Sequence, residues 1–150
     1  MSAPEDGGGS MLSGVGLALP TLARAAELGR RAGGVGFDWS AAREVREKVL
    51  EELAELDAAV AEGAVVAPGG PARGAGPAVV EELGDLLFAI ASWGRHLGVD
   101  PDAALTAANA KFERRFGWME RTARERAVDL GALTPAEWEQ LWRESKAAVG

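Results

Sequence analysis

The sequence predicts an all-α fold, a helical bundle, and three observations support this. Apolar residues recur every three or four positions over long stretches, as they do on one face of a helix. Prolines and capping residues precede these stretches and glycines follow them, which marks helix starts and stops. No stretch has the short turn between alternating segments that indicates a β-hairpin. The connections between the expected helices suit a bundle.

Composition limits the classes of function. The chain has 150 residues, of which 47% are hydrophobic, so one domain with a real core is expected. The net charge of -7 argues against a general surface for polyanions, and we therefore expect no nucleic-acid partner. Without cysteine there is no disulfide, thiolate zinc site or cysteine nucleophile, which fits a cytoplasmic location.

The first residues are expected to lie outside the fold. Residues 1–14 are rich in glycine, serine and acid, so we predict a disordered tail followed by a single domain over residues 15–150. The apolar segment Met11 to Leu19 is short, contains Gly14 and Gly16, and follows acidic residues, which disfavours a signal peptide. No apolar run approaches the roughly 20 residues of a membrane span.

Two helices are expected in the first half of the domain. The first starts at Pro20, which suits position N1, and stops at Gly33 and Gly34. The second covers residues 41–62, with Ser40 as N-cap and Gly63 at its end.

A flexible Gly/Pro/Ala loop, residues 63–77, then leads to a third helix. Its glycines do not form a phosphate-binding loop, because no G-K-[ST] ending follows them. The third helix covers about residues 78–97 and stops at Gly98. His96 lies near its C-terminal end, where a cation complements the helix dipole. Since no Glu-x-x-His occurs, a metal ligand is disfavoured there, as is a ferritin-like di-iron bundle.

The second half predicts two more helices. Asp100, Pro101 and Asp102 open a fourth helix to about Arg126. Its apolar stripe is made of Leu105, Ala108, Phe112, Phe116 and Met119. Thr134-Pro135-Ala136-Glu137 forms a capping box with proline at N1 and starts the last helix, in which we expect Trp138 to be a core residue.

Acidic residues suggest a site between the second and third helices. Helical geometry places Glu52 beside Glu55, and Glu82 beside Asp85, each pair at the edge of an apolar stripe. Two facing pairs of carboxylates repel one another unless a cation lies between them, and oxygen ligands suit Mg²⁺ or Mn²⁺. The same acids also suit a solvated helix face, on which Lys48 would pair with Glu52 at i,i+4.

Three segments, in order, carry a family resemblance. They are K-V-L-E-E-L-A-E-L (48–56), V-E-E-L-G-D-L-L-F (80–88) and A-N-A-K-F-E-R-R-F (108–116). The run closely resembles the MazG family of nucleoside triphosphate pyrophosphohydrolases, over roughly residues 12–147. The segment before it resembles the connector that precedes the second catalytic-type domain of longer MazG proteins. The resemblance implies hydrolysis of nucleoside triphosphates to monophosphates and pyrophosphate, and a role in nucleotide-pool house-cleaning.

The resemblance also implies roles for individual residues. Mg²⁺ would be bound by Glu52, Glu55, Glu82 and Asp85, while Glu51 and Glu81 beside them are candidates for orienting the ligands or water. Candidates for binding the substrate are Lys48, Asn109, Lys111, Arg115, Trp142 and Lys146. In contrast, Arg114, Arg121, Arg124 and Arg126 are expected to be solvated. The resemblance implies a homodimer or a dimer of dimers in which neighbouring subunits complete the active site. Apolar stripes this wide on a short chain also need partners.

Two other classes of function stay open at this point. The bundle could be a regulatory or protein-binding module with a vestigial metal site, although all four acids are present. It could also be a purely structural helical domain. The nucleobase is not predicted, because base contacts depend on how the helices pack.

Overall fold

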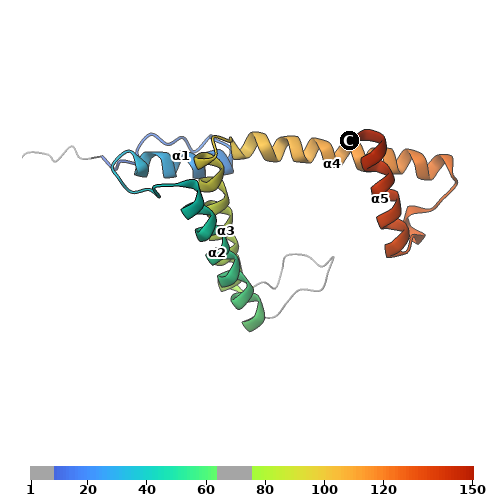
Figure 1. Ribbon diagram of the computed structural model, residues 1–150, viewed down its shortest axis with the longest axis horizontal. Coiled ribbons are helices and arrows are strands. Elements are labelled where there is room, and N and C mark those ends of the chain that lie inside the picture. The colour runs from blue at the N-terminus through green and yellow to red at the C-terminus, as the bar shows by residue number, and fades with distance from the viewer. Residues whose placement is uncertain (1–8, 64–75) are drawn as a thin grey trace, which may run out of the picture. The chain divides into compact units, whose positions relative to one another are not determined.

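The computed structural model describes residues 9–63 and 76–150, and in these residues it contains five α-helices, one short 3-10 helix and no strand (Figure 1). This confirms the all-α class. The chain divides into two compact units, residues 1–102 and residues 103–150, which are described separately. None of the helices in the described part combines the length and the apolar character that crossing a membrane requires.

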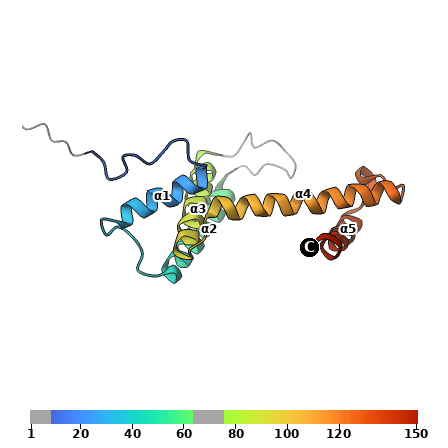
Figure 2. The ribbon, with the colours of Figure 1, turned by 90° about the horizontal axis from the view of Figure 1, so that it is seen from above.

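The first unit is built on a pair of antiparallel helices. Helix α2 (Ala42–Glu62) and helix α3 (Pro77–His96) lie side by side in both views (Figures 1 and 2). Helix α1 (Thr21–Gly33) packs against α3. The small side chains of Ala89, Ala91 and Ser92 are buried on α3, and Val45 is buried on α2. Small residues let helix axes approach closely, so these positions form the centre of the unit.

Two predicted helix starts are wrong by one residue. Pro20 is the N-cap of α1, with φ -51° and ψ 145°, and not its first helical residue. Ala41, and not Ser40, is the N-cap of α2. The Ser40 hydroxyl donates to both carboxylate oxygens of Glu44 at 2.9 Å, and the Ser40 N–H donates to the same carboxylate at 2.8 Å. Ser40 is therefore engaged by a side chain one turn away and caps no backbone N–H.

The predicted stops of α2 and α3 agree with the structure. Gly63 is the C-cap of α2. Beyond α3, Gly98 has φ +73°, in the left-handed region that favours glycine. The predicted loop falls mostly on residues 64–75 and the predicted tail mostly on residues 1–8, and both stretches lie outside the described residues. Of the remaining tail, residues 11–14 form turns, and the Ser13 carbonyl accepts a hydrogen bond from Arg31 Nη1 at 3.1 Å.

A polar cluster ties the segment before α2 to the end of α3. Asp38 accepts hydrogen bonds from Nη1 and Nη2 of Arg95 at 2.8 and 2.9 Å. His96 Nε2 lies 2.8 Å from Asp38 Oδ1, and its ring meets the edge of Trp39 at 6.3 Å between centroids. His96 was predicted to act at the helix terminus alone, and the structure adds a specific carboxylate partner.

The second unit contains most of helix α4 (Pro101–Glu125), the 3-10 helix η1 (Leu130–Ala132) and helix α5 (Pro135–Val149). The predicted capping box is present at the start of α5: Thr134 N–H donates to Glu137 Oε2 at 2.7 Å, and Glu137 N–H donates to Thr134 Oγ1 at 3.3 Å. Met119 and Leu141 are buried in this unit.

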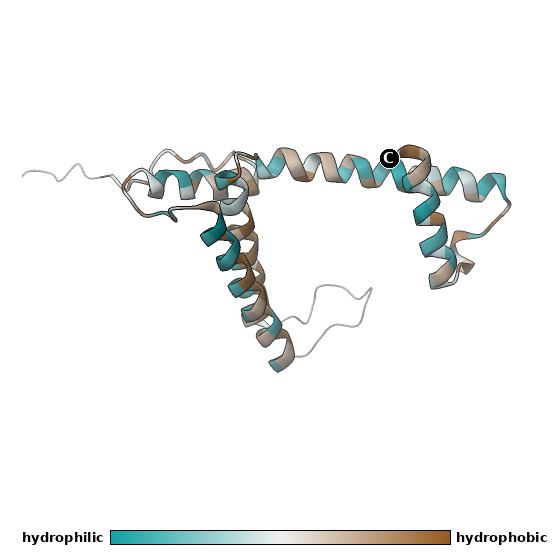
Figure 3. Ribbon diagram, viewed as in Figure 1, coloured by the Kyte–Doolittle hydropathy of each residue, from teal (hydrophilic) through white to brown (hydrophobic). Residues whose placement is uncertain are grey.

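Much of the apolar surface of the first unit is exposed in the single chain. Figure 3 shows hydrophobic residues along α3 and on part of α2. Leu53, Leu83, Leu87 and Ile90 are 43%, 46%, 45% and 43% exposed. The helices are thus amphipathic as predicted, but one chain covers only part of their apolar faces.

Candidate metal centre

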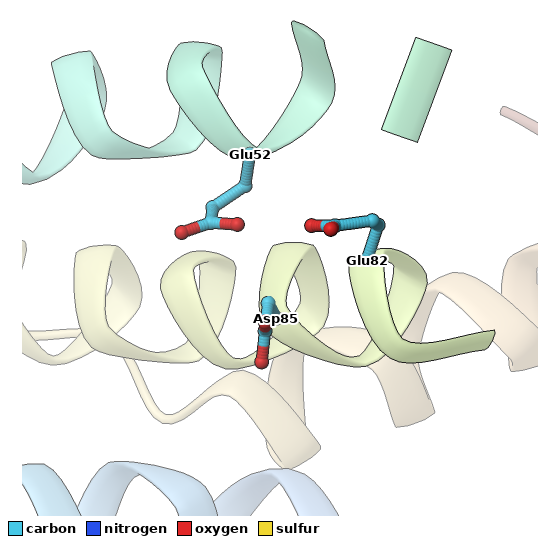
Figure 4. A group of neighbouring side chains, drawn as sticks. All are labelled: Glu52, Glu82 and Asp85. Carbon is cyan, nitrogen blue, oxygen red and sulfur yellow. The ribbon is translucent and has the colours of Figure 1, made fainter. Parts of the chain in front are cut away.

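Three carboxylates from α2 and α3 form the cluster on which the site is built. Glu52 on α2 and Glu82 and Asp85 on α3 each place a carboxylate oxygen within 4.8 Å of the others. Figure 4 shows Glu52 reaching from α2 toward α3, and Glu82 turned toward Glu52. Residues three positions apart on a helix share a face, which brings Glu82 and Asp85 to the same side. We call Glu52, Glu82 and Asp85 the carboxylate cluster.

Glu52 is the buried member of this cluster. The residue is only 5% exposed, and its Oε1 lies 2.6 Å from Lys48 Nζ. Its second oxygen, Oε2, is buried and has no hydrogen-bond partner among the described residues. Leaving a buried acceptor unsatisfied costs about 1–3 kcal/mol, and more for a charged group. A cation beside Oε2 would remove this cost, so the cluster fits a divalent metal ion.

The other two members provide access from solvent. Glu82 is partly buried and Asp85 is exposed. Burial thus falls from Glu52 to Asp85. A cation can reach the cluster from the side of Asp85, and an anionic ligand could approach the cation from the same side. An all-oxygen donor set of this kind suits Mg²⁺ or Mn²⁺.

Glu55, the fourth predicted ligand, is not part of the carboxylate cluster, but the negative charges of the cluster affect its pKa. The negative charge of Glu52 raises the pKa of Glu55 above its usual value, and partial loss of hydration and the charge of Glu82 contribute further. Glu55 is exposed and is not among the acids whose oxygens lie within 4.8 Å of one another, so its role as a fourth ligand stays a prediction.

Lys48 and Glu51 adjoin the cluster on α2. In addition to its contact with Glu52, Lys48 Nζ lies 3.4 Å from Glu51 Oε2. The hydrogen bond with Glu52 is the main cause that raises the pKa of Lys48. The i,i+4 ion pair between Lys48 and Glu52, which the sequence suggested, is therefore present. Glu81 is exposed and is not part of the cluster.

Apart from Lys48, the predicted substrate-binding residues belong to the second unit, and the structure brings three of them together. The Arg115 guanidinium lies 5.5 Å from the ring centroid of Trp142, and the Lys146 ammonium lies 5.8 Å from it. Arg115 Nε also donates to the Gly150 carbonyl at 3.2 Å. Asn109 and Lys111 are exposed on α4.

Sequence reasoning missed the aromatic surroundings of Trp142. Phe112 contacts Trp142 at 5.7 Å between centroids, and Phe116 stacks on Trp138 at 6.4 Å. Phe112, Phe116, Met119, Trp138 and Trp142 line a hollow of about 430 Å³. Trp138, predicted to be a core residue, is only half-buried and forms part of this wall. The aromatic hollow could have been predicted from the i,i+4 spacing of Phe112 with Phe116 and of Trp138 with Trp142.

Comparison with known proteins identifies relatives along most of the chain. The nucleoside triphosphate pyrophosphohydrolases of Escherichia coli K12 and O157:H7 are each 37% identical over 137 residues, which are 91% of this chain and 49% of theirs. The nucleoside triphosphate pyrophosphohydrolase/pyrophosphatase MazG of Thermotoga maritima is 35% identical over 128 residues, 85% of this chain and 45% of its own length. No family model matches the chain. The chain therefore spans about half the length of the curated relatives it matches.

Proposed function

We propose that this chain is a MazG-like domain that hydrolyses nucleoside triphosphates to nucleoside monophosphates and pyrophosphate, with Mg²⁺ or Mn²⁺ as cofactor. Two observations support the proposal: a buried Glu52 oxygen has no partner among the described residues, and Glu52 forms the carboxylate cluster with Glu82 and Asp85. The relatives' names support the reaction, and the carboxylate cluster supports its dependence on a metal ion.

Within this proposal, Glu52, Glu82 and Asp85 hold the cation, with Glu55 as the fourth ligand. A bound divalent cation would offset the negative charge of the triphosphate and activate water for attack on phosphorus. Glu52 fixes one side of the site, because its burial between the helices restricts its rotamers. Glu51 and Glu81, which flank the ligands on their own helices, are proposed to orient ligands or water.

The nucleotide is proposed to use the residues around Trp142. The indole offers a flat face on which a base can stack, and base stacking on an aromatic side chain is worth about 1–3 kcal/mol. Arg115 and Lys146 hold positive charge at the same ring, where it can meet phosphate oxygens. Lys111 and Asn109 are proposed to contribute from the exposed side of α4.

Assembly as a homodimer or a dimer of dimers is also proposed. Its support is the exposure of Leu53, Leu83, Leu87 and Ile90 on α2 and α3, since apolar stripes on a helix pair usually pack against a partner. We further propose a cytoplasmic enzyme that removes unwanted nucleotides from the cellular pool.

Product analysis tests the reaction directly. The protein is incubated with Mg²⁺ and a panel of canonical, deoxy and oxidised nucleoside triphosphates, without added pyrophosphatase, and an early time point is separated by chromatography. Monophosphate with pyrophosphate supports the proposal. Diphosphate with orthophosphate would mean a phosphatase. Absence of any hydrolysis would favour the alternative, a regulatory module whose metal site is vestigial.

A further inference from the structure

We propose that Lys48 acts as an internal counterion of Glu52 and that a divalent cation displaces it from Glu52 toward Glu51. This inference rests on the proposed metal site. It adds a residue of the chain itself that competes with the metal ion and so sets the affinity of the site.

The two carboxylate oxygens of Glu52 have different surroundings. Lys48 Nζ binds Oε1 at 2.6 Å, while Oε2 is buried without a partner among the described residues. The ammonium therefore offsets the charge of Glu52, whose side chain is 7% exposed, but satisfies only one of its two carboxylate oxygens. A buried carboxylate is poorly tolerated unless it is paired. Lys48 thus stabilises the cluster when no metal ion is bound, and leaves the second oxygen for a ligand.

Lys48 and a divalent cation would compete for Glu52. A divalent ion bound by Glu52, Glu82 and Asp85 would lie within a few ångströms of the Lys48 ammonium, and like charges at that separation repel. Because Lys48 is 35% exposed and has a long flexible side chain, it can move away at little cost.

Lys48 already has a second carboxylate nearby. Glu51 Oε2 lies 3.4 Å from the same Nζ, and Glu51 is 58% exposed. A small movement of the ammonium exchanges Glu52 for Glu51 and keeps an ion pair. The ammonium then lies toward solvent, where it could meet an incoming anionic substrate.

Binding and stability measurements with one matched pair of variants test this. Lys48→Met removes the counterion. Arg46→Met removes a cation two residues away, about 200° around the same helix, where Arg46 is exposed and has no described partner. Calorimetric titration with Mn²⁺ or Mg²⁺, in the absence of nucleotide, gives the affinity, and thermal unfolding with and without the ion gives the stability.

We expect Lys48→Met to bind Mn²⁺ roughly threefold to tenfold more tightly than the wild type. In the absence of metal, the Tm of Lys48→Met should be lower than that of the wild type. At saturating Mn²⁺ the two Tm values should be equal, because the ion replaces the lost counterion. Arg46→Met should match the wild type in both measurements. Lys48→Gln gives the same test if Lys48→Met does not fold.

A second variant tests the exchange. Glu51→Gln should weaken Mn²⁺ binding more in the otherwise wild-type protein, where Lys48 loses its second acceptor, than in the Lys48→Met background. An equal effect in both backgrounds would mean that Glu51 acts only through its own charge, and would overturn the exchange. Unchanged or weaker binding by Lys48→Met would overturn the counterion role and leave the metal site intact. Failure of the wild type to bind either ion would instead overturn the proposed metal site.

Discussion

Asp38 accepts two hydrogen bonds from the guanidinium of Arg95, although the two residues lie 57 positions apart in the chain. The pair is partly shielded from solvent, with side-chain exposures of 22% for Asp38 and 18% for Arg95. It joins the segment before α2 to the last turn of α3. The carboxylate cluster lies between the same two helices, so this pair helps to hold the scaffold on which the site is built.

Asp38→Asn should therefore lower the free energy of unfolding by about 2 kcal/mol at pH 7, because the charge-assisted hydrogen bonds with Arg95 are lost. Urea denaturation followed by circular dichroism measures the change. Asp57→Asn, at an exposed position on α2, is the control and should have little effect.

Acid should remove the contribution of Asp38. The hydrogen bonds with Arg95, and next the contact with His96, hold the pKa of Asp38 well below its usual value of 3.8. A group with a lowered pKa in the folded state contributes its full stabilisation above its unfolded pKa and loses it as the pH falls through the folded value. The difference in unfolding free energy between wild type and Asp38→Asn should thus shrink as the pH falls below about 4. A difference that does not change down to pH 2 would contradict this.

Glu52→Gln and Asp85→Asn should each reduce metal-dependent hydrolysis by at least about 100-fold, since replacing even residues that support a metal ligand can cost 10–100-fold. Helix content should be retained, as judged by circular dichroism. Glu47→Gln, at an exposed position on α2, should retain activity. Full activity of either ligand variant, or full activity of the wild type in excess chelator, would reject the assignment.

Lys111→Ala and Arg115→Ala should each lower kcat/KM for a nucleoside triphosphate by roughly tenfold, the usual effect of losing a charged contact to phosphate. Arg124→Ala should have little effect, because Arg124 is solvated. Steady-state kinetics compares the three variants. Equal losses in all three would show that the basic residues act only as diffuse charge.

Trp142→Ala should weaken binding of a non-hydrolysable nucleoside triphosphate analogue by roughly tenfold or more, because the base loses its stacking surface. Binding of inorganic tripolyphosphate, which has no base, should change much less. Calorimetric titration of both ligands separates base recognition from phosphate recognition. If both ligands lose the same affinity, Trp142 does not recognise the base, and it acts either on the phosphates or only in stabilising the fold.

Ile90→Glu should weaken self-association, because it places a charge in the apolar surface of α3, where Ile90 is 43% exposed. Light scattering at micromolar concentration compares the two proteins. A wild type that scatters as a monomer of 15.6 kDa would contradict the proposed assembly.

The sequence by itself determined the helices, because a helix depends on residues within one or two turns of each other. The capping box at Thr134 and Glu137 needs contacts over three residues and was predicted correctly. The spacing of Glu82 and Asp85 likewise placed both acids on one face. At the start of α2 the prediction was wrong by one residue, because Ser40 was expected to be the N-cap and Ala41 occupies that position.

Only the tertiary structure decided how the acids differ. The spacing of apolar residues places both Glu52 and Asp85 at the edge of an apolar stripe and predicts no difference in their burial. The packing of α2 on α3 buries Glu52 and leaves Asp85 exposed. The pairing of Asp38 with Arg95 had no signal in the sequence either, because no periodicity relates residues 57 positions apart. Burial and long-range pairing depend on which helix faces meet, and this is set by the packing of whole helices and not by the residues within a turn.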